Sequence, residues 1–237
     1  MAQSFFIWKG IDCRSKGIVM RGPAPIIRAE ERVKHVAIPG RSGELTETEG
    51  ENIYNSYIQT ISISVRGGFR VRQVYDWLRG SGYVTFSSEP DKKQKARVIG
   101  AVTLSKHSRN LDYWEGEVQF YCEPLKEKLA EDKVTISSSG ATVRNDGDVI
   151  SRPLWKVTAS GATVVITAGG KTLTSTEYSS GMVFYIDSDA GTVYNSDASA
   201  NWTKWSSGEF PVLNPGNNTV NGSGWSSIEI TKRERYL

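Results

Sequence analysis

The sequence predicts a mainly β protein with two domains, and three observations lead to this fold class. Short segments in which apolar and polar residues alternate recur along the 237 residues. Helical spacing is clear in a single segment. The composition also changes near residue 130, because residues 1–130 carry a net charge of +5 and residues 131–237 a net charge of −2. We therefore predict one domain over residues 1–130 and a second over residues 131–237.

Three alternating segments predict the sheet of the first domain. Thr60–Val65 places Ile61, Ile63 and Val65 on one face, and Ala96–Leu104 forms a similar strand. A longer strand places on one face the residues Trp114, Gly116, Val118, Phe120 and Cys122. One apolar and one polar face are typical of antiparallel sheets.

The helical segment is Val71–Arg79. Its residues Val71, Val74, Tyr75 and Leu78 follow the spacing of an amphipathic helix. The segment Gly80–Gly82 ends it, as glycine commonly does after a helix. A helix this short needs support, so we expect it to lie on the sheet.

The charged stretch Glu123–Lys133 interrupts the strand pattern and is interpreted as the linker. The second half is rich in Ser, Thr, Gly and Asn, and turn residues separate its short strands. The predicted strands are Val134–Ile136, Leu154–Val157, Thr163–Thr167, Met182–Ile186, Thr192–Tyr194 and Ser227–Ile230. Evenly spaced short strands over about a hundred residues predict a β-sandwich.

Composition excludes several classes of protein. Two Cys and two His are too few for a disulfide scaffold or most metal sites. We expect Cys13 and Cys122 to be reduced, buried thiols. No apolar run approaches the length of about 18 residues that a transmembrane helix needs. The first eight residues lack the basic leader of a signal peptide, so we expect synthesis in the cytosol and no membrane insertion.

The sequence shows no recognisable catalytic or cofactor motif. His35 and His107 do not lie in a nucleophile motif, and the acidic residues fall mostly in turns or on polar faces. Asp187–Gly191 fits a hairpin turn better than a calcium loop, whose Gly and Glu positions it lacks. Basic residues around the helix fit solvated or subunit-contact roles, so we expect no specific nucleic-acid binding. The chain is therefore predicted to be neither an enzyme nor a cofactor-binding protein.

Three tryptophans leave two readings open. Trp202, Trp205 and Trp225 lie in polar, Gly- and Ser-rich surroundings. Exposed aromatic faces can stack on sugar rings, which would make the second domain a carbohydrate-binding module. Alternatively, the same residues pack in the core of a small sandwich.

The order of short motifs resembles the distal tail protein (Dit) family of long-tailed bacteriophages over essentially the whole chain. Each motif is mostly turn chemistry, and the order of the set carries the resemblance. Ser42 stands where the family usually has an acidic residue. The motifs are Phe5–Gly10, Ile38–Leu45, Trp77–Val84, Phe86–Asp91, Phe120–Pro124, Asn145–Gly147, Ser151–Pro153, Ile186–Ser188 with Val193–Tyr194, and Phe210–Asn217.

This resemblance implies an architecture and a role. The first domain would be a tail-tube-like β-barrel with one helix and a long hairpin, and the second a galectin-like β-sandwich. The last residues, Glu229–Leu237, would return to the first domain. Six copies would form a ring, made in the host cytoplasm and located at the tail tip of the virion. The ring would join the tail tube protein to the tail-tip protein and the receptor-binding proteins. The alternative function is carbohydrate binding at the host surface through the second domain.

The expected hairpin around Pro39–Tyr57 supplies the candidate ring contacts. Ile38–Leu45 has the turn residues of a hairpin tip, and the aromatic residues beyond it have no obvious local core. Such a hairpin could pair with the sheet edge of a neighbouring copy. The predicted interface residues are Arg41, Leu45, Tyr54 and Tyr57.

Overall fold

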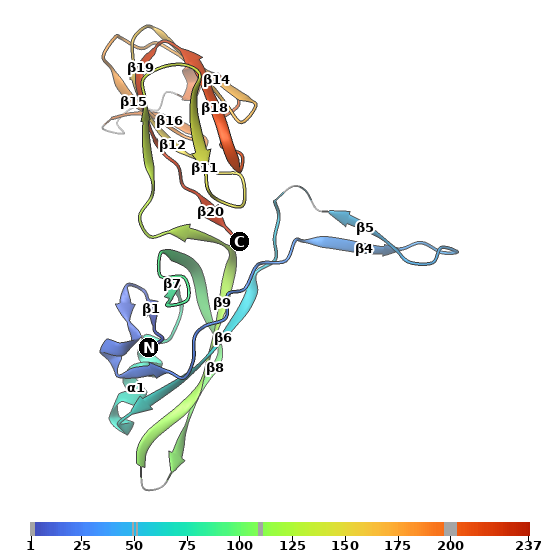
Figure 1. Cartoon of the computed structure of the whole chain (residues 1–237), viewed down its shortest axis with the longest axis vertical. Helices are drawn as coiled ribbons and strands as arrows, with labels where there is room; N and C mark the ends of the chain where they lie inside the picture. Colours follow the sequence, from blue (N-terminus) through green and yellow to red (C-terminus); the bar gives the residue numbers. More distant parts are fainter. Residues whose placement is uncertain (1–2, 49, 51, 109–110, 197–202) are drawn as a thin grey trace. The chain divides into compact units, whose positions relative to one another are not determined.

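The computed structural model describes residues 3–48, 50, 52–108, 111–196 and 203–237. It confirms a mainly β fold, in which the described residues form one α-helix, α1 (Gly68–Trp77) (Figure 1). The chain forms two compact units, which are Met1–Leu129 together with Leu237, and Ala130–Tyr236. Each unit has its own hydrophobic core.

The first unit contains a curled antiparallel sheet with the strand order β2-β1-β7-β8-β9-β6-β3. A short 3-10 helix, η1 (Cys13–Lys16), lies between β2 and β3. The strands are β1 (Phe6–Trp8), β2 (Ile11–Asp12), β3 (Ile18–Met20), β6 (Tyr57–Arg66), β7 (Ser81–Phe86), β8 (Lys92–Ser108) and β9 (Leu111–Lys128).

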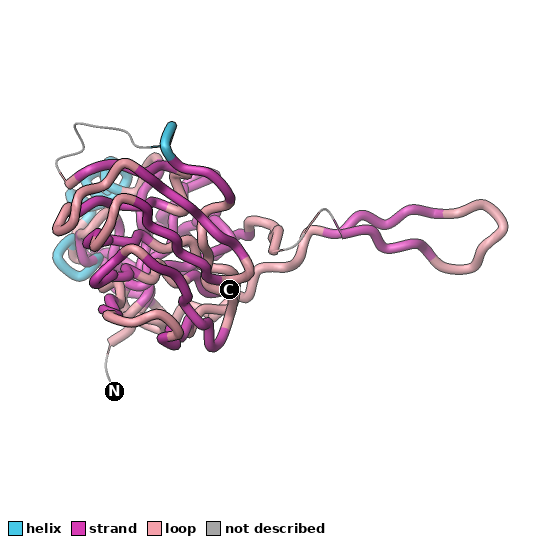
Figure 2. The backbone as a smooth tube through the Cα atoms, turned by 90° about the horizontal axis from the view of Figure 1, so that it is seen from above, coloured by secondary structure: helices cyan, strands magenta, loops and turns pink. Residues whose placement is uncertain are grey.

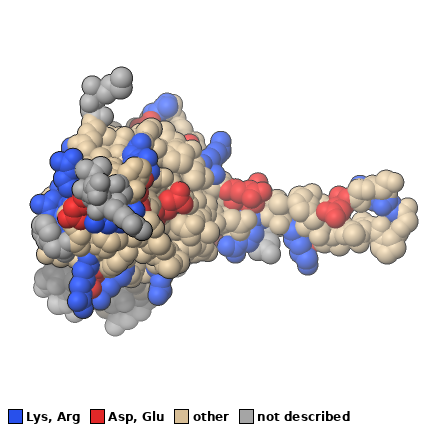
Figure 3. Space-filling model, turned by 90° about the horizontal axis from the view of Figure 1, so that it is seen from below, with Lys and Arg blue, Asp and Glu red and all other residues tan. Residues whose placement is uncertain are grey.

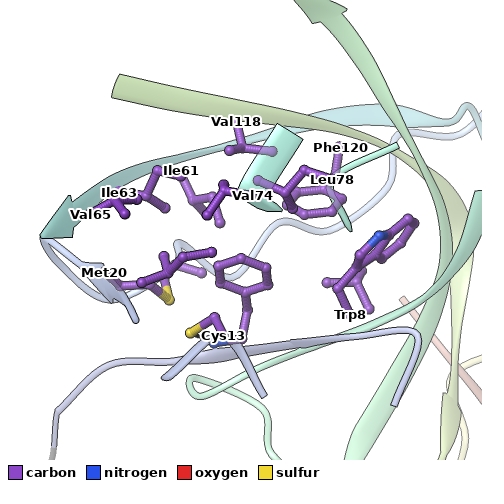
Figure 4. Close-up of a cluster of buried hydrophobic side chains, with 14 of the residues drawn as sticks. Trp8, Cys13, Met20, Ile61, Ile63, Val65, Val74, Leu78, Val118 and Phe120 are labelled. Atoms are coloured by element: carbon purple, nitrogen blue, oxygen red, sulfur yellow. Dashed lines mark hydrogen bonds between the residues drawn. The ribbon is translucent and has the colours of Figure 1, made fainter. Parts of the chain in front are cut away.

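The centre of this sheet confirms the predicted alternation. β6 pairs with β9 along its whole length, from Tyr57 opposite Cys122 to Arg66 opposite Tyr113. Because directly opposed residues share a face, the apolar residues of both strands point into one core. Figure 4 shows this cluster, in which Trp8 and Phe120 are fully buried and pack edge to face, with ring centroids 5.2 Å apart.

Helix α1 covers the core as predicted, but it begins three residues before the predicted start at Val71 and ends at Trp77. Val71, Val74 and Leu78 are buried, but Tyr75, which the helical spacing grouped with them, is 38% exposed. The earlier start has a tertiary cause, because both carboxylate oxygens of Asp112 accept a hydrogen bond from the Gly68 amide, at 2.8 and 2.9 Å. A capping residue 44 positions away cannot be recognised from local sequence.

The linker prediction for Glu123–Lys133 is wrong over its first half, because β9 continues to Lys128. Its end pairs with the start of β8, where Lys126 lies opposite Gln94. Lys126 is buried, and its ammonium group lies 2.7 Å from the Glu89 carboxylate and 3.3 Å from the Ile27 carbonyl oxygen. The charged residues that suggested a solvated linker are therefore partly internal.

The second unit has two five-stranded antiparallel sheets, with orders β10-β19-β12-β15-β16 and β11-β18-β13-β14-β17. Side chains from both sheets form one core, including Trp155, Ile166, Phe184 and Ile228. This arrangement confirms the predicted sandwich. Its strands are β10 (Lys133–Ile136), β11 (Ala141–Asn145), β12 (Leu154–Ala159), β13 (Thr163–Ala168), β14 (Lys171–Thr176), β15 (Val183–Asp187), β16 (Thr192–Asn195), β17 (Ser206–Gly208), β18 (Gly216–Ser223) and β19 (Trp225–Thr231), followed by the short β20 (Arg235–Tyr236).

Candidate functional site: the hairpin arm and the exposed sheet face

A long hairpin, here called the arm, comprises the described residues 30–48, 50 and 52–55 and extends away from the sheet of the first unit (Figures 1 and 2). Its strands are β4 (Val33–Ala37) and β5 (Glu44–Thr48), which pair from Val33 opposite Thr48 to Ala37 opposite Glu44. The turn between them contains Gly40 and Gly43, whose φ angles of 81° and 83° favour glycine. At the base, the Arg32 amide donates to the Ile53 carbonyl at 2.9 Å.

The two strands of the arm pair only with each other among the strands that the structure describes. All residues of β5 are exposed. An isolated two-stranded hairpin is marginally stable in water, so an arm of this kind gains from a surface that covers it.

One face of the arm carries its apolar side chains. Val36 lies opposite Leu45, and Ile38 follows Val36 two residues later, so the three share a face. Leu45 and Ile38 are each 39% exposed. This apolar patch of Val36, Ile38 and Leu45 lies close to the turn.

The four predicted interface residues fall at four different places. Arg41 lies exposed in the turn, and Leu45 belongs to the apolar patch. Tyr54 forms an isolated bridge with Glu31 at the base of the arm. Tyr57 is not part of the arm, because it begins β6 and its hydroxyl exchanges hydrogen bonds with the Gln94 amide at 2.9 and 3.1 Å. Burial raises the pKa of Tyr57 to about 12.

The hairpin expected around Pro39–Tyr57 is present, but it begins and ends earlier in the chain than those bounds. Its first strand precedes Pro39, and its second ends at Thr48. The predicted tip is correct. The boundaries were wrong because exposed arm strands lack the alternation that marks a half-buried strand.

The exposed large hydrophobic side chains of the described chain all belong to the first unit. Besides the arm, Ile58, Tyr83 and Tyr121 are 50%, 36% and 47% exposed on β6, β7 and β9. Ile58 and Tyr121 are directly opposed. Tyr83 and Tyr121 line a surface hollow of about 370 Å³. The sequence contained a signal for Ile58 and Tyr121, since both occupy the polar register of strands whose buried register is clear.

No protein-family model matches the chain, and no curated protein does so either. A solved structure does match: the Dit protein (gp 19.1) of SPP1, described as a paradigm of the hub adsorption apparatus in phages that infect Gram-positive bacteria. The match covers 100% of both chains with a TM-score of 0.81, at 16% sequence identity. The chain has the Dit fold. The resemblance seen in the order of short motifs is thus confirmed for the fold of the whole chain.

Within this Dit fold, the tryptophans considered for sugar binding have different positions. Trp225 begins β19 and packs in the core of the second unit, where it is 9% exposed. Trp205 ends a short 3-10 helix, η2 (Thr203–Trp205), and is half-buried. Trp202 lies outside the described residues. The carbohydrate-binding alternative stays a prediction, which glycan binding lost on Trp202→Ala would support.

Other candidate groups have structural partners in the Dit fold. Asp187 closes the turn between β15 and β16, accepting from the amides of Asp189 and Ala190, both at 3.0 Å. The Arg233 guanidinium lies 2.7 Å from the Asp187 carboxylate. Burial raises the pKa of Asp187, but Arg233 and the two amides outweigh it and hold that pKa below its ordinary value. The predicted hairpin turn is confirmed.

The histidines lie near single carboxylates, and the cysteines are buried without a disulfide. The His107 ring lies 3.3 Å from the Glu115 carboxylate, and His35 is 3.8 Å from that of Glu44. Cys13 and Cys122 are unpaired and buried, as predicted, and burial raises the pKa of Cys122 to about 12. Over the described ranges, no three His, Cys, Asp or Glu side chains gather as a metal site would require. The one described α-helix is too short and polar to cross a membrane.

Proposed function

We propose that the chain is a structural protein of a bacteriophage tail, acting as a hub at the tail tip rather than as an enzyme. The observation that carries this proposal is the full-length match to the Dit protein of SPP1. A structural hub needs extensive contacts with other proteins and no reactive site. The first unit offers such contacts, because it carries the exposed apolar side chains of the described chain.

The proposed assembly is a hexameric ring formed by the first unit. A ring requires two different surfaces on each copy that fit each other and close. The first unit has two separate apolar surfaces, the arm patch at Leu45 and the sheet face at Tyr121, which supports a head-to-tail contact. We further propose that the ring joins the tail tube protein to the tail-tip protein and carries the receptor-binding proteins.

Light scattering coupled to gel filtration tests the ring. The expected result is a species near six times 26.2 kDa. Deleting Ser42–Asn52 should leave a folded monomer, because it removes β5 and the last two residues of the turn. A deletion variant that still forms rings would show that the arm is not a ring contact.

A gentler variant keeps the arm and alters only its surface. Ile38→Thr with Leu45→Thr replaces two side chains that are each 39% exposed, so the fold should be preserved. The matched control is Ile26→Thr, which removes a 64% exposed apolar side chain outside the arm. Dissociation in the arm variant but not in the control would identify the arm, and equal dissociation in both would argue against a specific role.

A further inference from the structure

The surface hollow of the first unit lies beside a break in strand pairing. Gln94 of β8 lies opposite Lys126 of β9. Ala96, two residues further along β8, lies opposite Cys122. Three residues of β9 therefore face a single residue of β8, which forms a bulge. Bulges redirect side chains and are common beside binding sites. The hollow, of about 370 Å³, is lined by residues on both sides of this bulge.

A buried hydrogen-bond network holds the bulge in place. Gln94 is 4% exposed, and its amide group donates to the backbone carbonyl of Glu123. The same amide group donates to the Tyr57 hydroxyl at 2.9 Å, and that hydroxyl donates back to the Gln94 side-chain oxygen at 3.1 Å. The backbone beside the hollow is thus fixed by groups inside the sheet. A preformed hollow of this kind loses little conformational entropy when a ligand binds.

The strands direct a small set of side chains around the hollow. Val84, Ala96 and Cys122 are buried. Since successive residues of a strand point to opposite faces, their neighbours in the sequence project away from the core. The hollow is therefore bounded by two aromatic rings, two cations and one carboxylate. They belong to Tyr83 of β7, Lys95 and Arg97 of β8, and Tyr121 and Glu123 of β9.

The two cations of the hollow are available to a ligand. Lys93, two residues before Lys95, lies 3.6 Å from the Glu127 carboxylate. Lys95 and Arg97 are exposed, and within the described part of the chain neither has a carboxylate partner. The net charge of +5 over residues 1–130 adds to the attraction for an anion. Figure 3 shows that Lys and Arg predominate on the face of the first unit turned to the viewer.

Tyr121 supplies a surface on which a flat ring can stack. Its side chain is 47% exposed. The Tyr83 ring already has a contact, because the Lys93 ammonium group lies 4.9 Å from its centre. Two strand spacings, roughly 10 Å, separate β7 from β9 and leave space for a ring on Tyr121. An aromatic side chain on a sheet with cations beside it is a platform for a nucleobase and its phosphate.

We propose that the hollow binds a nucleotide, either free or as one unit of a single strand. The base stacks on Tyr121, and the phosphate lies between Lys95 and Arg97. Glu123 accepts a hydrogen bond from a sugar hydroxyl or a base amino group. The volume of about 370 Å³ falls within the range of about 300 to 1,000 Å³ that small-ligand pockets have. Stacking accepts any base, so this binding is not sequence-specific. It requires no other tail protein and goes beyond the proposed hub.

Isothermal titration calorimetry on the full chain tests the site. Adenosine 5′-monophosphate should bind, and adenosine and inorganic phosphate should each bind about tenfold more weakly or worse, because each lacks one half of the contact. A short labelled oligothymidine, followed by fluorescence anisotropy, distinguishes the two sources of the nucleotide. Binding of the monophosphate shows that a free nucleotide suffices. Binding of the oligothymidine alone assigns the site to a strand.

Matched variants locate the binding on the protein. Tyr121→Leu and Arg97→Ala should each weaken nucleotide binding by about tenfold or more, and both positions are exposed, so the fold should be preserved. The controls are Tyr75→Leu, at a 38% exposed tyrosine of α1, and Arg72→Ala, at an exposed arginine of the same helix. Circular dichroism checks the fold of all four. Equal weakening in site and control variants would overturn the assignment to the hollow.

Two further probes test the chemistry of the ligand. A double-stranded oligonucleotide of the same length keeps its bases paired and should bind more weakly than the single strand. Equal affinity for both would show attraction to phosphate alone and would overturn the stacking. An acidic peptide of the same net charge should also bind more weakly. Tighter binding of that peptide would identify the hollow as a protein-docking surface instead.

The same titrations separate the nucleotide site from the proposed ring. The sheet face at Tyr121 is one of the two surfaces assigned to the ring, so the Ser42–Asn52 deletion variant is titrated beside the full chain. Binding to either protein that Tyr121→Leu abolishes supports the site. If neither protein binds a nucleotide, the site is wrong and the hub stands. Light scattering on the same samples reports the ring, and a missing ring with nucleotide binding intact would count against the hub alone.

Discussion

Lys126 shows at the scale of one residue how a charged side chain becomes structural. Its side chain is 6% exposed. The ammonium group has three oxygen partners, the Glu89 carboxylate and the carbonyls of Ile27 and Leu237, the last at 3.5 Å. A buried charge is tolerated only when its partners replace water. Lys126 lies near the end of β9. It binds two other segments there, the one before the arm through Ile27 and the turn before β8 through Glu89.

The ion pair predicts a pH dependence of stability. Burial raises the pKa of Glu89, but Lys126 and Lys92 lower it more, so this pKa lies below the ordinary value of 4.5. A carboxyl with a lowered pKa stabilises the fold above the unfolded value, and this contribution is lost as the pH falls through the folded value. Denaturant titrations of the wild type should thus show a steeper loss of stability below about pH 4.5 than those of Glu89→Gln.

At pH 7 the Glu89→Gln variant should be less stable by about 1 to 3 kcal/mol, a range that allows for the partial exposure of Glu89. Asp76→Asn is the control, because Asp76 is 68% exposed and its contact with Arg79 is 4.0 Å long. Equal pH profiles for the wild type and Glu89→Gln would contradict the role assigned to this pair.

Trp225 gives a second prediction at the residue scale. Because it packs in the core of the second unit and is 9% exposed, Trp225→Ala should lower the free energy of unfolding by about 3 to 5 kcal/mol. Urea unfolding followed by far-ultraviolet circular dichroism measures this. Unchanged stability combined with lost glycan binding would instead favour a sugar contact at this residue.

At the scale of elements, β9 is the strand on which the first unit depends, since it pairs with both β6 and β8. Gly116 lies on it next to the register shift between Ile99 and Thr103 of β8. A Cβ at Gly116 would overlap the carbonyl oxygen of Thr103. The close approach of the two backbones therefore requires glycine.

Gly116→Ala should consequently destabilise the first unit by about 1 to 3 kcal/mol. Gly22→Ala is the matched control in the same unit, because a Cβ there meets nothing within 4 Å. Thermal unfolding of the two variants measures the difference. A Gly116→Ala protein as stable as the control would show that β8 and β9 can separate locally without cost.

The strands also show which elements the local sequence pattern can predict and which it cannot. Strands with one apolar face, such as β6 and β12, were predictable because every second side chain must be apolar to face the core. β14, β17 and β18 were missed, since their sequences are dominated by Ser, Thr, Asn and Gly and bury few large side chains. β11 was missed because its five residues include a single large apolar side chain, Val143. These strands exist because neighbouring strands supply hydrogen bonds and a core.

For the whole molecule, the two separate cores predict two unfolding events. The first core contains residues such as Phe120 of unit one, and the second contains residues such as Trp155 of unit two. Calorimetry of the full chain should resolve two transitions, of which Gly116→Ala lowers one and Trp225→Ala the other. A single transition shifted equally by both variants would show that the units unfold as one.

The sequence by itself determined the mainly β class, the single helix, the sandwich of the second half and the order of motifs that resembles the Dit family. These features depend on local periodicity and turn chemistry, which neighbouring residues encode. Only the tertiary structure decided that Lys126 and Trp225 are internal, that Tyr57 belongs to the sheet, and that Ile58, Tyr121 and Arg97 form one surface. Those outcomes depend on which distant strands pair and in which register, and no stretch of sequence contains that information alone.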